Sequence, residues 1–485
     1  MNKIFEKSIL ELHKLLVEKK ITSLELVEAC IENVKNDKCN SFEATAFEQA
    51  RIEASKITEV KEDEILKGIP FIAKDNYSTK GVETTASSNI LNGYIPLFDA
   101  TVISKLKRKG MILVAKTTMD ELAMGGTGTT GHKGVTTNPY DRERIAGGSS
   151  CGSAAALAQG ITNFALGSDT GDSVRKPASH DGLVGFKPTW GRVSRYGLFP
   201  FAPSLDCVAY FNKNVLDSSY ILSAIAGHDN KDMSSSTARK EKYEDYVLNK
   251  KTLKRVGYIK AVMDADFDPF IKDSYKKLLK ALEEKGYEIV EYDYPVDLLN
   301  AIYPTYMIIS CAEATSNNAN LDGIRFGPKA NNNPKTWEEY MTQARTAGFS
   351  DLIKRRFVIG SFSLMSQNQE EMFTRAQKAR RLIVDELNKF FESIDYLVVP
   401  AAYSLPKKIN ELSTSWSTKP DFLDNIMALG NFGGNPSLTL PMCIENGLPV
   451  GVNITGRPFE DGYTFGLAKE IEDITKLSNL TAEVK

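Results

Sequence analysis

The sequence predicts an α/β fold in which helices cover a central mixed β-sheet. Short apolar runs such as 69–73 and 111–115 have the length and composition of buried strands, and segments with helical spacing of apolar residues lie between them. The composition supports a large core, because 42% of the 485 residues are hydrophobic and 25% are charged. These values exclude a mostly disordered chain, and the alternation of elements favours a layered architecture.

The predicted elements follow one another in order along the chain. Residues 8–35 are expected to be helical, because a capping box at 22–25 precedes apolar residues at helical spacing. Further strands are expected at 164–166, 256–259, 287–290 and 396–399. Further helices are expected at 101–110, 153–159, 274–285 and 370–392. The polar segment 229–245 is either a domain boundary or a surface excursion within one domain.

The charge balance and the cysteine pattern exclude several functions. Sixty basic and 62 acidic side chains give a net charge of -2, which argues against a nucleic-acid-binding surface as the main role of the chain. No apolar run reaches 18 residues and no signal peptide is recognised at residues 1–7, so we expect a cytoplasmic protein with no membrane segment. Six scattered cysteines and four histidines predict neither disulfides nor a metal site.

One segment, residues 147–189, departs from ordinary core composition. Glycines and small hydroxyl residues cluster there in two loops, each beside an apolar run. Glycine permits close backbone approaches, and exposed N–H groups in such loops form natural sites for an anion or an oxyanion. The segment is therefore the candidate for chemistry.

Three mechanisms compete for this segment. A phosphate-binding loop is disfavoured, because the spacing G-x-x-x-x-G-K-[ST] is absent. A nucleophile elbow matches at residues 148–152, but its histidine partner would have to be His180 or His228, and neither has a strong sequence context. The third mechanism uses a lysine as the base. The simplest alternative for that lysine, Lys74, is an ion pair with Asp75 or another surface carboxylate.

The segment 147–189 closely resembles the signature sequence of the amidase family, and this resemblance favours the lysine mechanism. It implies an α/β/α sandwich around a central mixed β-sheet and a Ser–cis-Ser–Lys triad. By position in the motifs, Ser173 matches the nucleophile, Ser149 the cis-serine and Lys74 the base. We expect a single domain over residues 1–485, with N-terminal helices at about 1–60 and the signature core at about 65–210.

Five further stretches resemble one subgroup of that family: residues 117–127, 192–198, 312–317, 322–327 and 354–356. This subgroup consists of the A subunits of glutamyl-tRNA(Gln) amidotransferases. The resemblance implies hydrolysis of glutamine to supply ammonia for converting Glu-tRNA(Gln) to Gln-tRNA(Gln). It also implies B and C partner subunits in a heterotrimer, with Glu-tRNA(Gln) contacted mainly by the B subunit. No cofactor is expected in this chain, and ATP and magnesium are expected at the partner.

The implied mechanism places physical demands on its residues. Lys74 must be neutral to accept a proton, and burial among apolar residues would lower its pKa, because desolvation disfavours the charged amine. Ser149 would then relay a proton from Ser173 to Lys74. We expect the oxyanion hole to be formed by backbone N–H groups of Thr170, Gly171, Asp172 and Ser173.

Glutamine also carries an α-ammonium and an α-carboxylate group, which need charged partners. By resemblance, Arg356 and Asp424 fit these roles, with Tyr306 and Thr127 lining the pocket. Arg355 remains an alternative to Arg356 as the carboxylate ligand.

The signature also departs from the family pattern. Cys151 and Asp172 replace residues that are usually glycine, and residues 176–182 differ from the common apolar version. A carboxylate facing the oxyanion would repel it, so we expect the Asp172 side chain to point away, toward Arg175 or Lys176. Ser150 and Ser153 are expected to be helix-capping and packing residues.

Two rival functions remain open. One is a stand-alone amidase that hydrolyses small or acyl amides without a partner. The other is a degenerate amidase fold that is kept as a structural subunit, and Asp172 is its only support.

Overall fold

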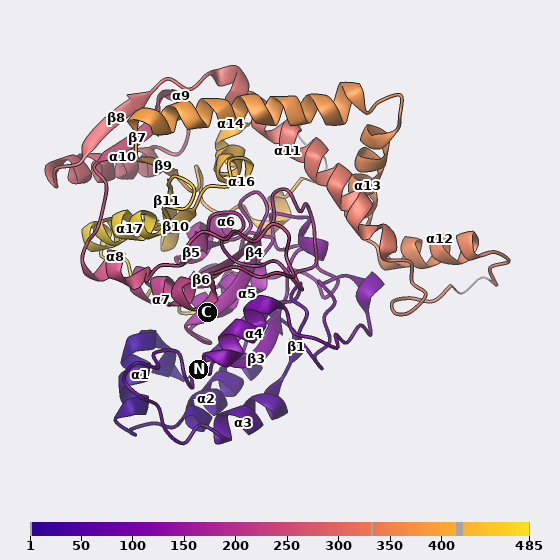
Figure 1. The fold of residues 1–485 in the computed structure, drawn as a ribbon, viewed down its shortest axis with the longest axis horizontal. Helices are drawn as coiled ribbons and strands as arrows, with labels where there is room; N and C mark the ends of the chain where they lie inside the picture. The colour runs from indigo at the N-terminus through magenta and orange to yellow at the C-terminus, as the bar shows by residue number, and fades with distance from the viewer. Residues whose placement is uncertain (1, 331–332, 414–420, 485) are drawn as a thin grey trace.

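The computed structural model describes residues 2–330, 333–413 and 421–484, and its described strands form one mixed sheet (Figure 1). The predicted fold class is confirmed, and each predicted strand is present within a few residues of its expected position. Across the sheet the order is β1 (Phe42–Thr45), β3 (Ile112–Thr117), β2 (Pro70–Lys74), β4 (Phe164–Asp169), β6 (Cys207–Asn212), β5 (Val184–Lys187), β10 (Ser437–Glu445), β11 (Leu448–Thr455), β9 (Tyr396–Pro400), β7 (Arg255–Ile259) and β8 (Glu288–Tyr292).

The helices connect and cover these strands. The expected capping box is present, with the Thr22 side chain accepting from the Glu25 N–H. None of the described helices is long and apolar enough to cross a membrane. The helices are α1 (Ile9–Val17), α2 (Ser23–Lys35), α3 (Phe47–Ser55), α4 (Thr101–Arg108), α5 (Cys151–Ala158), α6 (Arg175–Asp181), α7 (Val215–Ile225), α8 (Glu244–Leu248), α9 (Lys260–Asp264), α10 (Pro269–Glu284), α11 (Val296–Asn317), α12 (Trp337–Gly348), α13 (Asp351–Leu364), α14 (Arg375–Ser393), α15 (Phe422–Asn425), α16 (Leu429–Phe432) and α17 (Asp461–Thr475).

The two faces of the sheet carry separate hydrophobic cores. Along β9, Tyr396 and Val398 pack into one core, whereas Leu397 and Val399 pack into the other. Successive side chains of a strand point to opposite faces, so the two cores lie on opposite sides of this part of the sheet. Apolar residues of α10 and α17 belong to the first core, and those of α11 and α14 to the second. This arrangement is an α/β/α sandwich.

The polar segment 229–245 is a surface excursion. The strands before and after it, β6 and β7, belong to the same sheet. Asp229 accepts hydrogen bonds from Thr101 and Ser194, both at 2.6 Å, and Asp232 accepts one from the Arg195 N–H at 2.7 Å. These contacts hold the segment against the start of α4 and the loop of Ser194 and Arg195.

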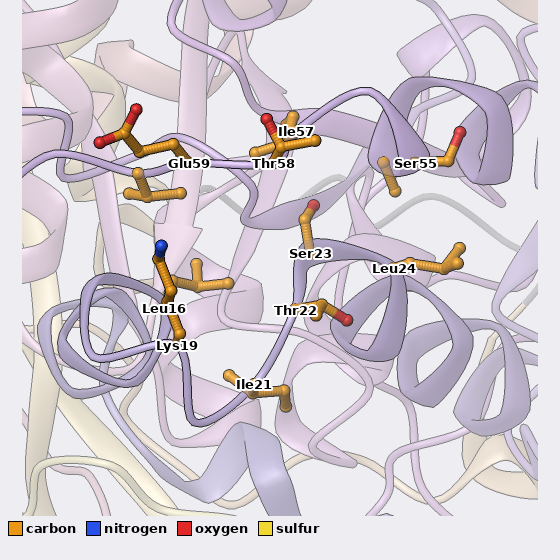
Figure 2. A pocket seen from close by; sticks show the side chains of 12 residues that line it. Leu16, Lys19, Ile21, Thr22, Ser23, Leu24, Ser55, Ile57, Thr58 and Glu59 are labelled. Carbon is orange, nitrogen blue, oxygen red and sulfur yellow. The ribbon is translucent and has the colours of Figure 1, made fainter.

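A pocket of about 410 Å³ lies among α1, the start of α2 and residues 54–60 (Figure 2). Leu16, Ile21, Leu24 and Ile57 supply much of its apolar wall, and Lys19 and Glu59 lie at its edge. None of the predicted site residues lines it, so the signature segment lies at another place in the fold.

The topology places the candidate residues at one edge of the sheet. Strands β2 and β4 are parallel neighbours, with Ala73 opposite Leu166. The carboxyl ends of parallel strands meet at the same edge, where α/β proteins commonly bind ligands. Lys74 ends β2, and the loop that carries Ser173 follows β4.

Candidate active site

Lys74 lies at the end of β2 with its amine surrounded by hydroxyl groups. All five residues of this strand are buried, and Lys74 is 0% exposed. Its Nζ lies 2.7 Å from Ser149 Oγ, 2.9 Å from Ser150 Oγ and 3.0 Å from Ser168 Oγ. Among the described residues, no carboxylate comes within 4.0 Å of this amine. Neutral oxygens therefore supply its close contacts.

This environment changes the charge of the lysine. Burial lowers the pKa of Lys74 to about 7, because a buried amine loses the solvation of its charged form. More distant acidic groups, including Asp120 and Asp169, act in the opposite direction and are outweighed. A large fraction of Lys74 is thus neutral near pH 7 and able to accept a proton.

The alternative ion pair with Asp75 does not form. Asp75 lies 3.2 Å from Lys116 Nζ and also accepts hydrogen bonds from Thr85. Consecutive side chains of an extended segment point in opposite directions, which separates Asp75 from the amine of Lys74.

The loop before α5 brings Ser149 to Lys74. The Gly148–Ser149 peptide bond is cis, and the Ser149 carbonyl accepts the Asp120 N–H at 3.1 Å. A side chain at Gly148 would have no space, since its Cβ would lie 2.0 Å from an Asp120 oxygen. The glycine is therefore required by close packing against the acidic residue.

Asp120 is a supporting residue that the sequence analysis missed. Its carboxylate is completely buried and accepts from consecutive backbone N–H groups in the range 127–130. Through these bonds it holds the loop of Thr127 beside the loop of Ser149. The signal in the sequence is an acidic residue followed by the glycine- and threonine-rich stretch 125–131.

Ser150 differs from its expected role. It precedes α5, but its hydroxyl makes no capping bond. Instead, Ser150 Oγ accepts from Lys74 and donates to the Ser168 carbonyl at 3.2 Å. The capping prediction is wrong because the buried amine offers a stronger partner. Ser153 does act in packing, and it donates to the Leu166 carbonyl at 2.8 Å.

Ser173 lies in the second loop, between β4 and α6. The two loops are joined by a hydrogen bond from the Ser150 N–H to the Ser173 carbonyl at 3.2 Å. Ser173 is 4% exposed, and its hydroxyl forms no hydrogen bond with any described residue. The structure thus brings Lys74, Ser149 and Ser173 to adjoining loops at one sheet edge, and their catalytic roles remain a prediction.

The backbone around Ser173 is arranged to receive negative charge. Within the described part of the chain, no acceptor is bonded to the N–H groups of Thr170, Gly171, Asp172 and Ser173. The loop is fixed by other bonds, since Thr170 Oγ1 donates to Asp206 at 2.7 Å. Unoccupied N–H groups in a held loop are suited to an oxyanion hole.

A buried ion pair braces this loop. Arg175 donates to both oxygens of Asp169 at 2.8 and 3.1 Å, and to the Gly171 carbonyl at 2.7 Å. Although burial alone would raise the pKa of Asp169, the Arg175 guanidinium lowers it to about 2. The sequence analysis missed this pair, although two opposite charges flanking Ser173 in a segment of small residues were a usable signal.

Neither of the two cations expected for Asp172 forms an ion pair with its carboxylate in the described part of the chain. Arg175 is engaged by Asp169 and by carbonyl groups, so it does not pair with Asp172. Lys176 lies one helical turn after Asp172, and its backbone N–H donates to the Asp172 carbonyl at 2.9 Å. The half-buried Asp172 carboxylate forms no hydrogen bond or ion pair with a described residue. Burial raises its pKa to about 6, and Lys176 partly opposes this shift.

Tyr306 and Thr127 lie against the two reactive loops. A Cβ at Gly171 would meet the Tyr306 ring at 3.0 Å, which places this ring of α11 on the oxyanion loop. The Thr127 N–H lies beside Gly148, 3.0 Å from where a Cβ would stand. Burial raises the pKa of the Tyr306 hydroxyl, so the phenol is protonated. Both residues therefore reach the region assigned to substrate.

The structure separates the two candidate arginines. Arg356 is half-buried, and its Nη1 lies 4.0 Å from the sulfur of Met307 on α11. Its guanidinium stands over the Phe201 ring at 5.8 Å from the centroid. Arg355 is on the exposed face of α13, beside Val358. Arg356 is thus the one that faces the Tyr306 side of the fold.

Asp424 lies in α15 and contacts α6. Its carboxylate is 3.6 Å from Lys176 Nζ, and its side chain is 53% exposed. Lys176 lowers the pKa of Asp424, which therefore remains ionised. An ionised carboxylate at the rim can bind a cation.

Two other nucleophile hypotheses receive no support from the geometry. Burial raises the pKa of the Cys151 thiol to about 12, so it is protonated, and it packs with Cys39 and two alanines. His228 bonds Asn230 and the Ser235 carbonyl in the surface excursion, and burial lowers the pKa of His180 to about 3. Among the described residues, neither histidine bonds a hydroxyl of the signature loops.

Comparison with known proteins agrees with this arrangement. The family model described as Amidase matches residues 25–465. The A subunit of glutamyl-tRNA(Gln) amidotransferase from Streptococcus pneumoniae (strain Hungary19A-6) is 38% identical over 97% of this chain and 96% of its own. The A subunit of the same enzyme from Caldanaerobacter subterraneus subsp. tengcongensis is 37% identical over 98% of this chain and 97% of its own.

Solved structures show the same similarity in three dimensions. The crystal structure of the glutamyl-tRNA(Gln) amidotransferase A subunit from Thermotoga maritima has a TM-score of 0.82 and 33% identity, and it covers 100% of this chain and 99% of its own. The peptide amidase from Stenotrophomonas maltophilia shares the fold, with a TM-score of 0.81 at 23% identity and 98% of each chain covered. In both comparisons the similarity covers nearly the full length of this chain.

Proposed function

This chain belongs to the amidase family, and we propose that it is the glutamine-hydrolysing A subunit of a tRNA-dependent amidotransferase. The support for this narrower assignment is similarity at 37–38% identity over nearly the full length of proteins bearing that name. The chemistry rests on one observation: the buried Lys74 amine, with a pKa of about 7, lies 2.7 Å from Ser149 Oγ.

In the proposed reaction, neutral Lys74 accepts a proton from Ser149, which accepts one from Ser173. Ser173 Oγ then bonds to the carboxamide carbon of glutamine, and the carbon–nitrogen bond breaks with protonation of the leaving ammonia. Water hydrolyses the resulting glutamyl ester by the same relay. The N–H groups of residues 170–173 stabilise the oxyanion in both steps, and each such donor is typically worth about 100- to 1,000-fold in rate.

Charged groups at the rim orient the substrate. Arg356 binds the α-carboxylate, and Asp424 binds the α-ammonium. Tyr306 and Thr127 form the walls that direct the carboxamide toward Ser173. This division places charge recognition on α13 and α15, away from the buried amine.

The ammonia would serve a reaction on another subunit. A B subunit would bind Glu-tRNA(Gln) and activate its glutamyl carboxylate with ATP and magnesium, and a C subunit would join the two in the cytoplasm. The net charge of -2 on this chain agrees with tRNA binding mainly elsewhere.

The test is release of ammonia from glutamine by the chain co-purified with its natural partners. We expect release to rise when Glu-tRNA(Gln) and ATP are present, and to disappear in Ser173→Ala. Hydrolysis of assorted amides without partners would instead support a stand-alone amidase. Absence of any serine-dependent release would support a structural subunit.

A further inference from the structure

Lys176 occupies the position at which a substrate cation is expected. Its Nζ lies 3.6 Å from Asp424 Oδ1 and 3.4 Å from the Asp424 carbonyl oxygen. The Lys176 side chain is 12% exposed, whereas that of Asp424 is 53% exposed. The carboxylate is therefore open to solvent on one side and covered by a lysine ammonium on the other.

Asp172 offers the same lysine a second partner. The bond from the Lys176 N–H to the Asp172 carbonyl extends helical spacing back to Asp172, so the two side chains lie one turn apart. An acidic residue four positions before a lysine is the favourable orientation for a helical ion pair. The Asp172 carboxylate has no partner among the described residues, although Lys176 acts on it electrostatically.

We propose that Lys176 is a specificity-determining residue: a resident cation that the α-ammonium of the substrate displaces from Asp424 toward Asp172. This inference rests on the proposed function, because it takes Asp424 as the ligand of that ammonium. The flexible four-carbon stem of lysine permits the exchange, and the exposed side of Asp424 lets the substrate approach.

The exchange links recognition to the reaction. Asp172 immediately precedes Ser173, where negative charge develops on the oxyanion, and an uncompensated carboxylate there opposes that charge. Arg175 compensates it only in part, since its guanidinium is bound to Asp169 and to carbonyl groups. When Lys176 moves to Asp172, its ammonium group supplies the compensating charge. An amide without an ammonium group leaves Lys176 on Asp424, and Asp172 then has no cation paired with it directly.

The test compares glutamine with 5-amino-5-oxopentanoate, which is glutamine without its α-ammonium group. In Lys176→Met, the glutamine KM should fall about two- to fivefold, because a partly exposed competing ion pair is lost. The glutamine kcat should fall as well, because Asp172 loses its cation. Neither constant should change for the analogue. Lys176→Arg, which keeps the cation, should retain the wild-type difference between the two substrates.

The second part of the test uses the variant Asp172→Asn. It should raise the glutamine KM, because displaced Lys176 has no second partner, and it should raise kcat on the analogue. In the Lys176→Met background, the effect of Asp172→Asn on the glutamine KM should disappear, as expected for coupled residues.

Equal changes for both substrates in Lys176→Met, or no change for either, overturn the inference while leaving Ser173-dependent glutamine hydrolysis intact. Additive effects of the two substitutions overturn it as well. Absence of glutamine hydrolysis in the wild-type complex overturns the proposed function, and this inference falls with it.

Discussion

Lys74 at the sheet edge and Lys176 at the rim represent two environments for the same side chain. Lys74 is fully buried at the end of β2 and contacts hydroxyl groups, whereas Lys176 lies on α6 beside the carboxylate of Asp424. Burial without a carboxylate partner lowers the pKa of an amine, while a neighbouring carboxylate favours the ammonium form. The difference places the proposed base at the end of a buried strand and the cation proposed for substrate recognition on a helix.

Lys116 sharpens the comparison, because burial alone does not distinguish it from Lys74. It lies on the neighbouring strand, is equally buried and pairs with Asp75 at 3.2 Å. Lys116 is held in a buried ion pair, whereas Lys74 has only neutral oxygens within hydrogen-bond distance among the described residues.

The largest expected effect comes from replacing each of these two lysines. Lys74→Met should lower kcat for glutamine hydrolysis by at least about 1,000-fold, as expected for loss of the general base of a coupled triad. Lys116→Met should lower the free energy of unfolding by about 3–5 kcal/mol, because Asp75 is left buried without its partner. Ammonia release and denaturant unfolding measure the two effects.

The contrast between the two lysines is contradicted if Lys74 proves to stabilise the fold and Lys116 proves to be needed for activity. Lys74→Met should leave stability nearly unchanged, since it removes an amine that burial disfavours in its charged form. A large loss of stability in Lys74→Met with near-normal kcat would make Lys74 a structural residue.

The pH dependence tests the state of Lys74 directly. Since its pKa is about 7, protonation should reduce kcat/KM about tenfold for each pH unit below that value, and activity should rise as the pH increases through 7. Steady-state rates between pH 5 and 9, with unfolding monitored in parallel, provide the measurement. A kcat/KM that still rises tenfold per pH unit between pH 8 and 9 would indicate a lysine with its ordinary pKa.

A smaller effect is expected from Ser168, which accepts hydrogen bonds from both Lys74 and Asn76. Ser168→Ala should lower kcat about tenfold, as expected for one hydrogen bond to a charged group. It should also move the acidic limb of the pH profile to lower pH, because the charged amine loses an acceptor. Ser168→Thr keeps the hydroxyl, so its kcat and the position of its acidic limb should stay close to those of the wild type. A reduced kcat with an unmoved profile would leave Ser168 with a packing role only.

The smallest effect is expected at the substrate wall. Gly171→Ala would place a Cβ 3.0 Å from the Tyr306 ring, which must then shift. We expect the glutamine KM to rise about three- to tenfold through displaced contacts, equivalent to about 1 kcal/mol. Gly126→Ala is the matched control, because a Cβ there meets no atom within 4 Å. Equal changes of the glutamine KM in the two variants would show that Tyr306 does not contact the substrate.

Much of the fold could be predicted from local pattern. The strands at the reactive edge are short apolar runs, and the capping box fixes the start of α2. The hairpin of β10 and β11 was not predicted, although Asn446–Gly447 between two alternating apolar segments was its signal. Its strands complete the centre of the sheet and lie far from the signature in sequence.

The site could be predicted only as far as its motifs extend. Lys74, Ser149 and Ser173 belong to recognisable short contexts, and their approach to one sheet edge follows from parallel pairing. The contacts of Asp120 and Asn76 could not be predicted, since they depend on packing between separate loops. Likewise, the choice of Asp169 as the partner of Arg175 required the three-dimensional arrangement.

Arg175 also connects the order of synthesis to activity. Besides Asp169, its guanidinium binds the Met427 carbonyl, Asn431 and Ser437, which lie 252 to 262 positions later in the chain. A nascent polypeptide thus contains all three triad side chains, together with Asp169, long before it contains this distant part of the brace on their loop. Under the proposed function, a product released from the ribosome before residue 437 lacks that brace and generates no ammonia. Activity would therefore require residues 427–437 to fold onto the loop of Ser173.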